Sequence, residues 1–491
     1  MKILLASSEA HPFSKTGGLA DMVAALAKAL AKLGHEVGLV TPLYPSVRQR
    51  APGLERLPVP MEVDLGVRVL RPVIWTAAQR AGPRLYFVDQ PEFFQRSGIY
   101  QKYGRDYPDN AERFIFFSKV VARLALDLSP RPDLVHLNDW QTAFAAMFLN
   151  RARAGQGEGP RPAVCFTIHN LAYQGVFPAS HYALANLRWE YFTPETAEYY
   201  GRLNCLKGAL SCADMITTVS PTYAREITTP EAGCGLDGLL RRRADRLVGI
   251  TNGIDLEEWD PAANPALPHP NTPADLSGKT ACKLALQREL GLPESESIPL
   301  FGNIGRMAHQ KGLDLLLPAL EQALANASMQ FVLLGSGSPA LEQACRDLMA
   351  RYPGRVSVRV GFDEALSHRI EAGCDFFVMP SRFEPCGLNQ MYSLRYGTIP
   401  IVHATGGLED TITDIRQEPA GTSDPVRANG IKFHELSVPA VAKALGKALS
   451  LYAEPELLRR FRRNSMAADC SWDRSAAEYL QVYERAVSFA R

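Results

Sequence analysis

Apolar and polar positions alternate along residues 1–40 in an order that predicts a strand, a helix and a second strand. Lys2–Ala6 is a short apolar run, which is typical of a buried strand. From Leu19 to Leu33 the apolar residues recur at steps of three and four, which predicts an amphipathic helix packed on a sheet. Gly34 ends this helix, and His35–Val40 is the next predicted strand. The segment is therefore a predicted β-α-β unit with a right-handed parallel crossover.

Three more apolar runs in the first half of the chain end abruptly in polar residues. They are Leu134–Leu137, Val164–Ile168 and Met215–Val219. The polar pairs that follow them are Asn138-Asp139, His169-Asn170 and Ser220-Pro221. Open α/β sheets bind ligands at the carboxyl edge of their strands, so this edge is where we expect functional side chains.

The pattern of apolar and polar residues changes after about residue 250. A group of prolines with little periodicity around it predicts a surface loop near a domain boundary: Pro261, Pro265, Pro268, Pro270 and Pro273. Apolar strands separated by helical segments then resume at Leu300–Ile304, Phe331–Leu334, Val356–Val360, Phe376–Met379 and Ile399–Val402. These predict a second α/β domain without a fixed repeat. The last segment, Asp473–Phe489, is an amphipathic helix that could pack on either domain.

Composition narrows the class of protein. A chain of 491 residues predicts two to four domains. It has 53 lysines and arginines against 52 aspartates and glutamates, a net charge of +1, which gives no electrostatic case for binding nucleic acid or a membrane surface. Nine cysteines without a CxxC pair predict neither a disulfide framework nor a zinc site, and favour a reducing cytoplasm. The apolar run at the N-terminus is too short for a signal peptide, and no run of apolar residues is long enough to predict a transmembrane helix.

Two glycine-rich turns share the tetrapeptide TGGL. Lys15–Leu19 lies between the first strand and its helix, and Ala404–Leu408 lies between the strand at Ile399–Val402 and another predicted helix. Glycine lets a ligand approach the backbone, and a helix N-terminus offers N–H groups to an anion, although a tight turn alone also explains a Gly-Gly pair. Neither turn matches the dinucleotide pattern GxGxxG or the P-loop.

Charged residues follow several of the predicted strands. Arg306 and Lys311 come after Leu300–Ile304 and suit a diphosphate, or else belong to a solvated loop. Glu384 follows Phe376–Met379 in a proline- and glycine-bounded elbow that could fix a carboxylate, or is simply solvated. His169 ends a strand and is either a structural residue or a catalytic one. No spacing of His, Cys, Asp and Glu resembles a metal site.

Longer blocks of the sequence resemble the signatures of bacterial glycogen synthases and plant starch synthases. Those in the first half are Lys15–Asp21, Phe166–Gly175 and Thr218–Ala224. Those in the second half are Asn252–Asp255, Gln310–Gly312, Pro380–Leu388 and Thr405–Leu408. The blocks follow the order of that family and cover nearly the whole chain.

The resemblance implies an α/β fold of the GT-B type, with two Rossmann-like domains facing a central cleft. Residues 1–248, completed by the helix at 472–491, would form the acceptor side, and residues 249–471 would bind the nucleotide sugar. The implied reaction transfers glucose from ADP-glucose to the nonreducing 4-OH of an α-1,4-glucan such as glycogen, with retention at the anomeric carbon. Neither a metal nor another cofactor is implied.

Without a metal, the leaving diphosphate must be neutralised by protein groups. The resemblance assigns the diphosphate to Arg306 and Lys311. The N–H groups near Gly18 and along Thr405, Gly406 and Gly407 would complete the cradle. Lys15 would be a further phosphate or sugar contact.

The resemblance also assigns residues to the sugar and the base. Glu384 matches the essential glutamate near the sugar hydroxyls of the donor, and we assign it to sugar positioning and electrostatic support. His169 matches a residue beside the transferred glucose, and Asp21 matches a donor-site aspartate. Phe362 falls where relatives often place a tyrosine against adenine, and it can still stack. Asn252 is a weaker candidate on the nucleotide side.

Other functions remain open at this stage. The same fold could use UDP-glucose as the donor, or the chain could be a non-catalytic protein that binds glucan. An epimerase or a pyridoxal-phosphate-dependent phosphorylase on the same architecture is a further class, although nothing in the sequence points to that cofactor. No oligomeric state follows from the sequence.

Overall fold

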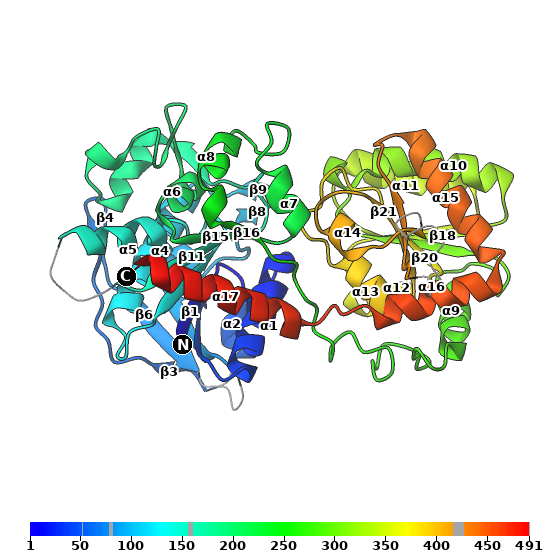
Figure 1. Ribbon diagram of the computed structural model, residues 1–491, viewed down its shortest axis with the longest axis horizontal. Coiled ribbons are helices and arrows are strands. Elements are labelled where there is room, and N and C mark those ends of the chain that lie inside the picture. The colour runs from blue at the N-terminus through cyan, green and yellow to red at the C-terminus, as the bar shows by residue number, and fades with distance from the viewer. Residues whose placement is uncertain (52, 78–81, 156–160, 416–426, 491) are drawn as a thin grey trace. The chain divides into compact units, whose positions relative to one another are not determined.

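The computed structural model describes residues 1–51, 53–77, 82–155, 161–415 and 427–490 (Figure 1). The chain divides into two compact units. The first consists of Met1–Gly253 together with Trp472–Arg491, and the second of Ile254–Ser471. We call them the N-terminal unit and the C-terminal unit.

The N-terminal unit is built on a nine-stranded sheet in the order β16-β15-β11-β10-β1-β2-β7-β6-β3. Its strands are parallel except at one side, where β6 runs antiparallel to β7 and to β3. The strands are β1 (Lys2–Ala6), β2 (Glu36–Pro42), β3 (Glu55–Arg56), β6 (Val73–Ala77), β7 (Arg84–Asp89), β10 (Leu134–Asn138), β11 (Ala163–Ile168), β15 (Met215–Thr218) and β16 (Leu247–Gly249).

Helices and short hairpins complete this unit. The helices are α1 (Gly18–Lys32), α2 (Pro45–Arg50), α3 (Pro91–Phe94), α4 (Asn110–Asp127), α5 (Phe144–Gly155), α6 (Cys205–Cys212), α7 (Pro221–Glu226), α8 (Asp237–Arg242) and α17 (Trp472–Ala490), with 3-10 turns η1 (Ala179–Ala185), η2 (Trp189–Tyr191) and η3 (Ala244–Arg246). The small sheets are β4 (Val63–Leu65) with β5 (Arg68–Leu70), β8 (Gln101–Lys102) with β9 (Arg105–Asp106), and β12 (Val176–Pro178), β14 (Arg202–Asn204) and β13 (Glu198–Tyr199).

The predicted β-α-β unit is present at the N-terminus. β1 pairs with β2 and β10 in parallel, and its central residues are buried because the sheet is covered on both faces. The apolar stripe of α1, which includes Val23, Leu26 and Leu30, is fully buried. The carboxyl ends of β1, β10 and β11 are therefore neighbours at one edge of the sheet.

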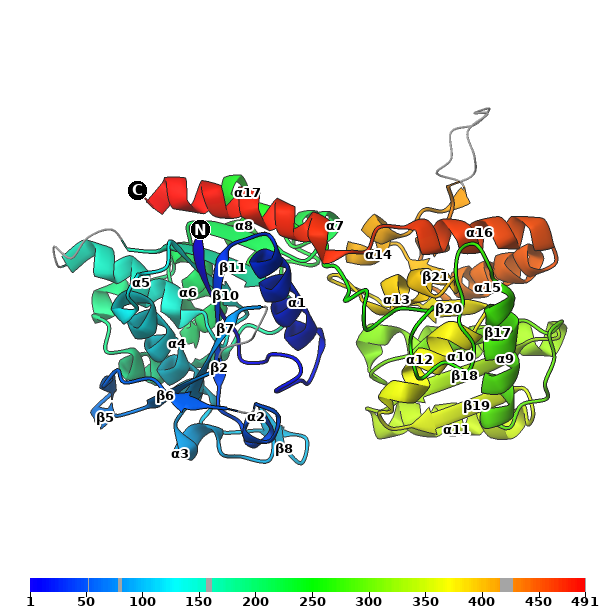
Figure 2. The same cartoon turned by 90° about the horizontal axis from the view of Figure 1, so that it is seen from below.

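The C-terminal helix α17 packs on the N-terminal unit, against α1 and β11 (Figure 2). The Tyr483 hydroxyl lies 2.8 Å from Nδ1 of His136, inside the sheet. The Ser475 hydroxyl donates to the carbonyl of Thr251 at 2.6 Å. Both contacts are buried, so the last helix is an integral part of the first unit although it is last in the chain.

The C-terminal unit has a six-stranded parallel sheet in the order β19-β18-β17-β20-β21-β22. Its strands are β17 (Leu300–Ile304), β18 (Gln330–Gly335), β19 (Val356–Val360), β20 (Phe376–Met379), β21 (Ile399–His403) and β22 (Ile431–Phe433). The helices are α9 (Ser277–Glu289), α10 (Leu313–Asn326), α11 (Pro339–Arg351), α12 (Glu364–Gly373), α13 (Asn389–Arg395), α14 (Gly406–Thr411), α15 (Val438–Tyr452) and α16 (Pro455–Ala467), with the 3-10 turn η4 (His309–Lys311).

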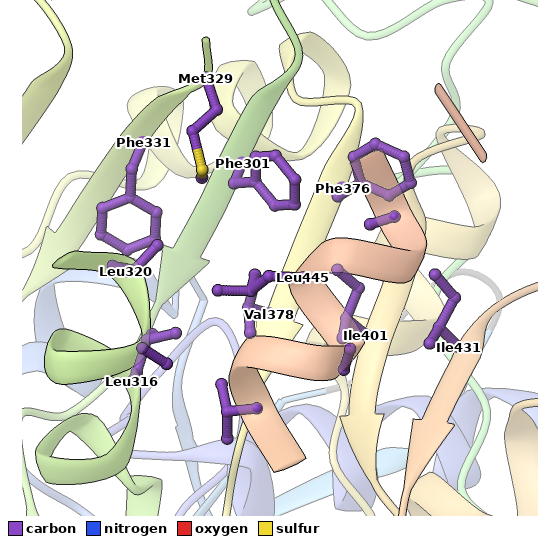
Figure 3. Packing of buried hydrophobic residues seen from close by; sticks show 14 of the residues in the cluster. Phe301, Leu316, Leu320, Met329, Phe331, Phe376, Val378, Ile401, Ile431 and Leu445 are labelled. Atoms are coloured by element: carbon purple, nitrogen blue, oxygen red, sulfur yellow. The ribbon is translucent and has the colours of Figure 1, made fainter. Parts of the chain in front are cut away.

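One face of this sheet forms a continuous apolar core with α10 and α15 (Figure 3). Phe301 of β17 stacks on Phe376 of β20, with ring centroids 5.0 Å apart. Leu320 of α10 and Leu445 of α15 are both fully buried in the same cluster. This core fixes β17 and β20, the two strands whose carboxyl ends carry the charged residues predicted from the sequence.

None of the helices in the described residues is long and apolar enough to cross a membrane. Within those residues, no group of three or more His, Cys, Asp and Glu side chains is placed to hold a metal ion.

Candidate functional site

The glycine-rich turn of the N-terminal unit leads into α1, with Gly17 at the N-cap and Gly18 as the first helical residue. Gly17 has a φ of −162°, which any residue adopts, and a Cβ placed on it would meet nothing within 4 Å. Neither strain nor crowding within the unit therefore calls for glycine here. The space where its Cβ would be leaves room for a ligand at this turn, and the anion site stays a prediction from the sequence.

The buried carboxylate of Glu9 holds this turn in place through hydrogen bonds to Thr16. Glu9 follows β1 and is 3% exposed. It accepts hydrogen bonds from the hydroxyls of Thr16 at 2.7 Å and Tyr100 at 2.6 Å, and a further bond from the backbone amide of Thr16. Burial raises the pKa of Glu9, and the hydrogen bonds from Tyr100 and Thr16 act in the opposite direction.

Two of the predicted site residues in this unit form an ion pair. Nζ of Lys15 lies 2.8 Å from Oδ1 of Asp21, and Nδ1 of His11 lies 3.6 Å from the same oxygen. The side chains of Lys15 and Asp21 are 34% and 23% exposed, so both remain accessible from solvent. Asp21 thus orients Lys15 beside the turn, one helical turn from Gly18.

His169 follows β11 and is held in one orientation by the end of β10. Nδ2 of Asn138 donates to the carbonyl of Ala6 at 3.1 Å, so Oδ1 of Asn138 must be the acceptor that faces Nε2 of His169 at 2.9 Å. The proton of the neutral ring is therefore on Nε2, and Nδ1 is an acceptor. Burial lowers the pKa of His169 to about 3, which keeps the ring neutral at physiological pH.

Asp139 is a residue of this edge to which sequence reasoning gave no role. It has a left-handed φ of 56°, and its Oδ1 accepts the backbone amide of His169 at 2.8 Å. Burial raises the pKa of Asp139 to about 7, although hydrogen bonds from the amides of His169 and Asn170 lower it. A carboxyl group with a pKa near neutrality can hold or release a proton under physiological conditions. The signal in the sequence was the abrupt Asn138-Asp139 ending of the strand.

Asn252, the remaining candidate in the N-terminal unit, lies three residues after β16. It is 6% exposed, and its buried Oδ1 has no hydrogen-bond partner among the described residues. A buried amide oxygen without a partner is unfavourable by itself, which is consistent with a polar group that a substrate would satisfy.

In the C-terminal unit, the structure brings Lys311 and Glu384 into direct contact. Nζ of Lys311 lies 2.6 Å from Oε2 of Glu384, which also accepts the Ser381 hydroxyl at 3.0 Å. The two paired side chains are 24% and 10% exposed. Gly312, with a φ of +68°, makes this contact possible, because a Cβ on it would lie 2.0 Å from the carbonyl oxygen of Pro380.

The second glycine-rich turn packs against the backbone of Glu384. Gly406 has a φ of +46°, and a Cβ there would lie 2.0 Å from the carbonyl oxygen of Glu384. The amide of Thr405 donates to the carbonyl of His403 at 2.9 Å, and that of Gly407 to the carbonyl of Glu384 at 3.2 Å. These two amides are already bonded within the protein, so a diphosphate could receive them only after those bonds broke. The turn supports the Glu384 loop directly.

Arg306 is connected to the Glu384 loop through the side chain of Gln310. Its Nη2 donates to Oε1 of Gln310 at 3.2 Å, and Nε2 of Gln310 donates to the carbonyl of Phe383 at 3.1 Å. Arg306 also lines a cavity of about 520 Å³ at the carboxyl ends of β17 and β18, together with His309 and residues 336–338. A volume in this range suits part of a nucleotide-sized ligand. Sequence reasoning did not single out the small polar residues 336–338.

Phe362 follows β19 and is 83% exposed. Its ring is open to solvent, so a flat group could stack on it. It lies at the same edge of the sheet as the loops that follow β17 and β20, because all three strands are parallel. No contact joins it to Lys311 or Glu384 in the structure.

Each unit thus gathers polar groups at the carboxyl edge of its own sheet. The C-terminal unit offers two cations, Arg306 and Lys311, around a largely buried carboxylate. Such cations can stabilise a leaving diphosphate, and such a carboxylate can bind sugar hydroxyls or a developing positive charge. The N-terminal unit offers a neutral imidazole, an open helix N-terminus and an exposed lysine.

Comparisons with known proteins agree with this chemistry. The family described as Starch synthase catalytic domain matches residues 2–242, and the family described as Glycosyl transferases group 1 matches residues 287–466. The chain is 49% identical to the Glycogen synthase of Anaeromyxobacter sp. (strain Fw109-5), covering 98% of this chain and 99% of that protein. It is 47% identical to the Glycogen synthase of Thioalkalivibrio sulfidiphilus, with 99% and 100% covered.

A solved structure of the catalytic domain of Starch Synthase IV from Arabidopsis thaliana, bound to ADP and acarbose, has the same architecture. This chain and the starch synthase domain superpose with a TM-score of 0.89 and are 35% identical, and the comparison covers 99% of each chain. The sucrose-phosphate synthase of Thermosynechococcus elongatus, at 18% identity and a TM-score of 0.61, shares the fold. The chain therefore has the GT-B fold, with Rossmann-like domains, that the resemblance implied. The chain belongs to the glycogen synthase family: it is a glycosyltransferase that elongates a glucan from a nucleotide-sugar donor.

Proposed function

We propose that this glycosyltransferase uses ADP-glucose and adds glucose to the nonreducing 4-OH of an α-1,4-glucan with retention of the anomeric configuration. The observation that carries the proposal is the Lys311–Glu384 pair at the carboxyl ends of β17 and β20. It places a cation and a carboxylate side by side where the sheet of the C-terminal unit would receive a nucleotide sugar. The choice of ADP is supported by the starch synthase structure that contains ADP.

The proposed roles in the C-terminal unit follow from charge. The bond between the anomeric carbon and the diphosphate breaks in the reaction, so negative charge grows on the diphosphate. We assign its neutralisation to Arg306 and Lys311, and we assign the sugar hydroxyls to Glu384. The paired state of Lys311 and Glu384 means that both side chains are pre-oriented before substrate arrives, which reduces the entropy lost on binding. Phe362 would stack on the adenine, and residues 405–407 would buttress Glu384.

The proposed roles in the N-terminal unit concern the transferred glucose and its acceptor. Lys15 and Gly18 would contact the donor, with Asp21 holding Lys15 in place. His169 is neutral because burial lowers its pKa to about 3, so it would act as a hydrogen-bonding group and not as a charged acid. Asn252 lies near the end of the N-terminal unit but within the predicted nucleotide-binding range 249–471, and it would supply its unpartnered amide oxygen to the nucleotide. In this assignment residues 1–248 with 472–491 serve the acceptor, and residues 249–471 serve the nucleotide.

A donor panel tests the proposal. The purified chain is incubated with glycogen and either ADP-glucose or UDP-glucose, each labelled in the glucose, and label in the washed polymer is counted. We expect incorporation from ADP-glucose to dominate. A clear preference for UDP-glucose would overturn the donor assignment. Binding of glycogen without release of nucleoside diphosphate from either donor would show that the chain has lost turnover.

A further inference from the structure

A second cavity in the C-terminal unit lies away from the donor residues. Its volume is about 530 Å³, and it is bounded by the start of α9, the residue before β20 and one side of α16. Asp375 on its wall bonds the amide of Leu300, the first residue of β17, at 2.9 Å. The cavity is therefore at the amino edge of the sheet, whereas Lys311 and Glu384 follow the carboxyl edge. The five residues of β17 separate the two edges by roughly 16 Å.

The lining of this cavity carries more positive than negative charge. Five basic side chains line it: Lys279, Lys283, Arg459, Arg462 and Arg463. Three carboxylates line it, and of these Asp275 and Glu296 are exposed at the rim while Asp375 is buried. In the interior, a single carboxylate thus faces several cations.

Both carboxylate oxygens of Asp375 form ion pairs with basic side chains of the cavity. Its oxygens lie 2.8 Å from Nζ of Lys283 and 2.5 Å from Nη2 of Arg462. Lys283 also donates to the hydroxyl of Tyr452 at 2.8 Å and to the carbonyl of Glu296 at 3.1 Å, so its three protons are satisfied. Asp375 is therefore the counter-ion of Lys283 and Arg462 and of no other basic side chain of the cavity.

The remaining cations lack a carboxylate inside the cavity. Lys279 is 2% exposed and bonds only the Thr398 hydroxyl and the carbonyl of Glu371. Its pKa is lowered to about 7, first by burial and then by the positive charge of Arg462. Nε of Arg462 is buried without a partner, and Arg463 has neither a hydrogen bond nor an ion pair among the described residues. Arg459 pairs with Glu456 one turn earlier on α16, a residue that does not line the cavity.

The start of α9 forms part of the same wall and is capped by one of the rim carboxylates. Oδ1 of Asp275 accepts the amide of Ser277, the first residue of the helix, at 2.9 Å. The positive end of this helix is therefore already compensated, and the attraction for an anion comes from the basic side chains. A solvated basic surface would expose all of these groups, but here Lys279 and most of Arg462 are withdrawn from water.

We propose that this cavity binds a phosphoryl group, as inorganic phosphate or as the phosphate of a small metabolite, at a site separate from the donor site. A phosphoryl dianion carries close to two negative charges and three acceptor oxygens, which matches several convergent donors better than a carboxylate does. The volume leaves room for a sugar-sized substituent beside the phosphate. The proposal does not depend on which nucleotide sugar the enzyme uses.

Calorimetric titration of the full-length chain tests the site. The probes are inorganic phosphate, pyrophosphate and glucose 1-phosphate, with sodium chloride at matched ionic strength as the blank. The test variant is Arg459→Ala combined with Arg463→Ala, two exposed positions on α16 whose loss we expect to leave the fold intact. The matched control is Arg460→Ala, an exposed arginine on the same helix that does not line the cavity.

We expect wild-type protein and Arg460→Ala to bind at least one probe equally, and the double variant to bind it about tenfold more weakly or worse. Lys311→Ala, which removes a donor-site cation, should leave this binding unchanged. A preference for glucose 1-phosphate over phosphate would identify a metabolite as the source, and equal affinities would identify the free ion. Absence of binding in the wild type, wild-type affinity in the double variant, or loss of binding in Lys311→Ala would each overturn the proposal.

Discussion

The Lys311–Glu384 pair makes Glu384→Gln the most informative substitution in the chain. Glutamine has nearly the same shape as glutamate, and its amide oxygen can still accept from Nζ of Lys311 or from the Ser381 hydroxyl. What the change removes is the negative charge. It therefore separates the electrostatic role of Glu384 from its role in shaping the loop.

The expected effect on folding is small. The Lys311 side chain is 24% exposed and that of Glu384 is 10% exposed, so water can solvate much of the charge left without a partner. We expect a loss of about 1–2 kcal/mol, between the values for exposed and buried pairs. For a domain of this size that is a fall in Tm of about 2–4 °C per kcal/mol, so the variant stays folded at room temperature.

The expected effect on catalysis is much larger. Loss of one charge interaction made in the transition state raises the barrier by about 2.7–4 kcal/mol, a fall in kcat of roughly a hundred- to a thousandfold. Transfer of labelled glucose into glycogen measures kcat, and thermal melting followed by circular dichroism measures Tm. The matched control is Glu435→Gln, an exposed glutamate of the same unit whose side chain has no partner among the described residues.

Two results would refute this reasoning. If Glu384→Gln turned over at the wild-type rate, the carboxylate would have no electrostatic role. If its activity fell only in proportion to unfolded protein, Glu384 would be a structural residue. A normal rate in Glu435→Gln is needed to attribute the loss to the site.

Three further predictions follow from single contacts. Lys311→Ala should weaken ADP binding roughly ten- to a hundredfold, because a charge-assisted hydrogen bond contributes about 1.5–3 kcal/mol; an unchanged Kd in calorimetry would contradict this. His136 is buried with a pKa lowered from 6.5 to about 3, so only the unfolded chain binds a proton there as pH falls from about 6.5 to about 3, and stability is lost over that window. Urea unfolding should therefore show that His136→Gln loses about 2 kcal/mol less than wild type between pH 7 and pH 5, and equal losses would disprove it. Gly17→Ala should leave Tm unchanged and raise KM for the donor, because its Cβ meets nothing within 4 Å in the protein; wild-type kinetics would count against a ligand above this turn.

The parallel strands were the most predictable part of the fold. β17, β19 and β20 begin and end at the residues that the apolar runs predicted. A strand covered on both faces is apolar throughout, so its limits are visible in the sequence. The antiparallel strands β3 and β6 at the side of the first sheet gave no such signal. The burial of β6 alternates between buried and half-buried residues, and β3 is two exposed residues long.

The sequence predicted where the candidate site residues lie along the strands, but it did not predict which side chains contact one another. Polar residues after the strands predicted at which edge of each sheet polar side chains gather, because all parallel strands point the same way. The pairing of Lys311 with Glu384 joins residues 73 positions apart, and only the packed structure shows it. Glu9 and Asp139 were missed for a related reason. Each looks like an ordinary loop carboxylate in the sequence, and only tertiary burial raises its pKa and gives it hydrogen-bond donors.

The two TGGL turns show that one sequence pattern can have two physical causes. In the first turn Gly17 has an unstrained φ and open space where its Cβ would be, so the protein itself does not require glycine there. In the second, Gly406 has a φ of +46° and would place a Cβ 2.0 Å from the carbonyl oxygen of Glu384. Under the proposed function, glycine would admit a ligand in one unit, whereas in the other it allows close packing against the Glu384 loop. The shared tetrapeptide therefore marks a strand-to-helix turn in both units, while its function in each depends on what packs above it.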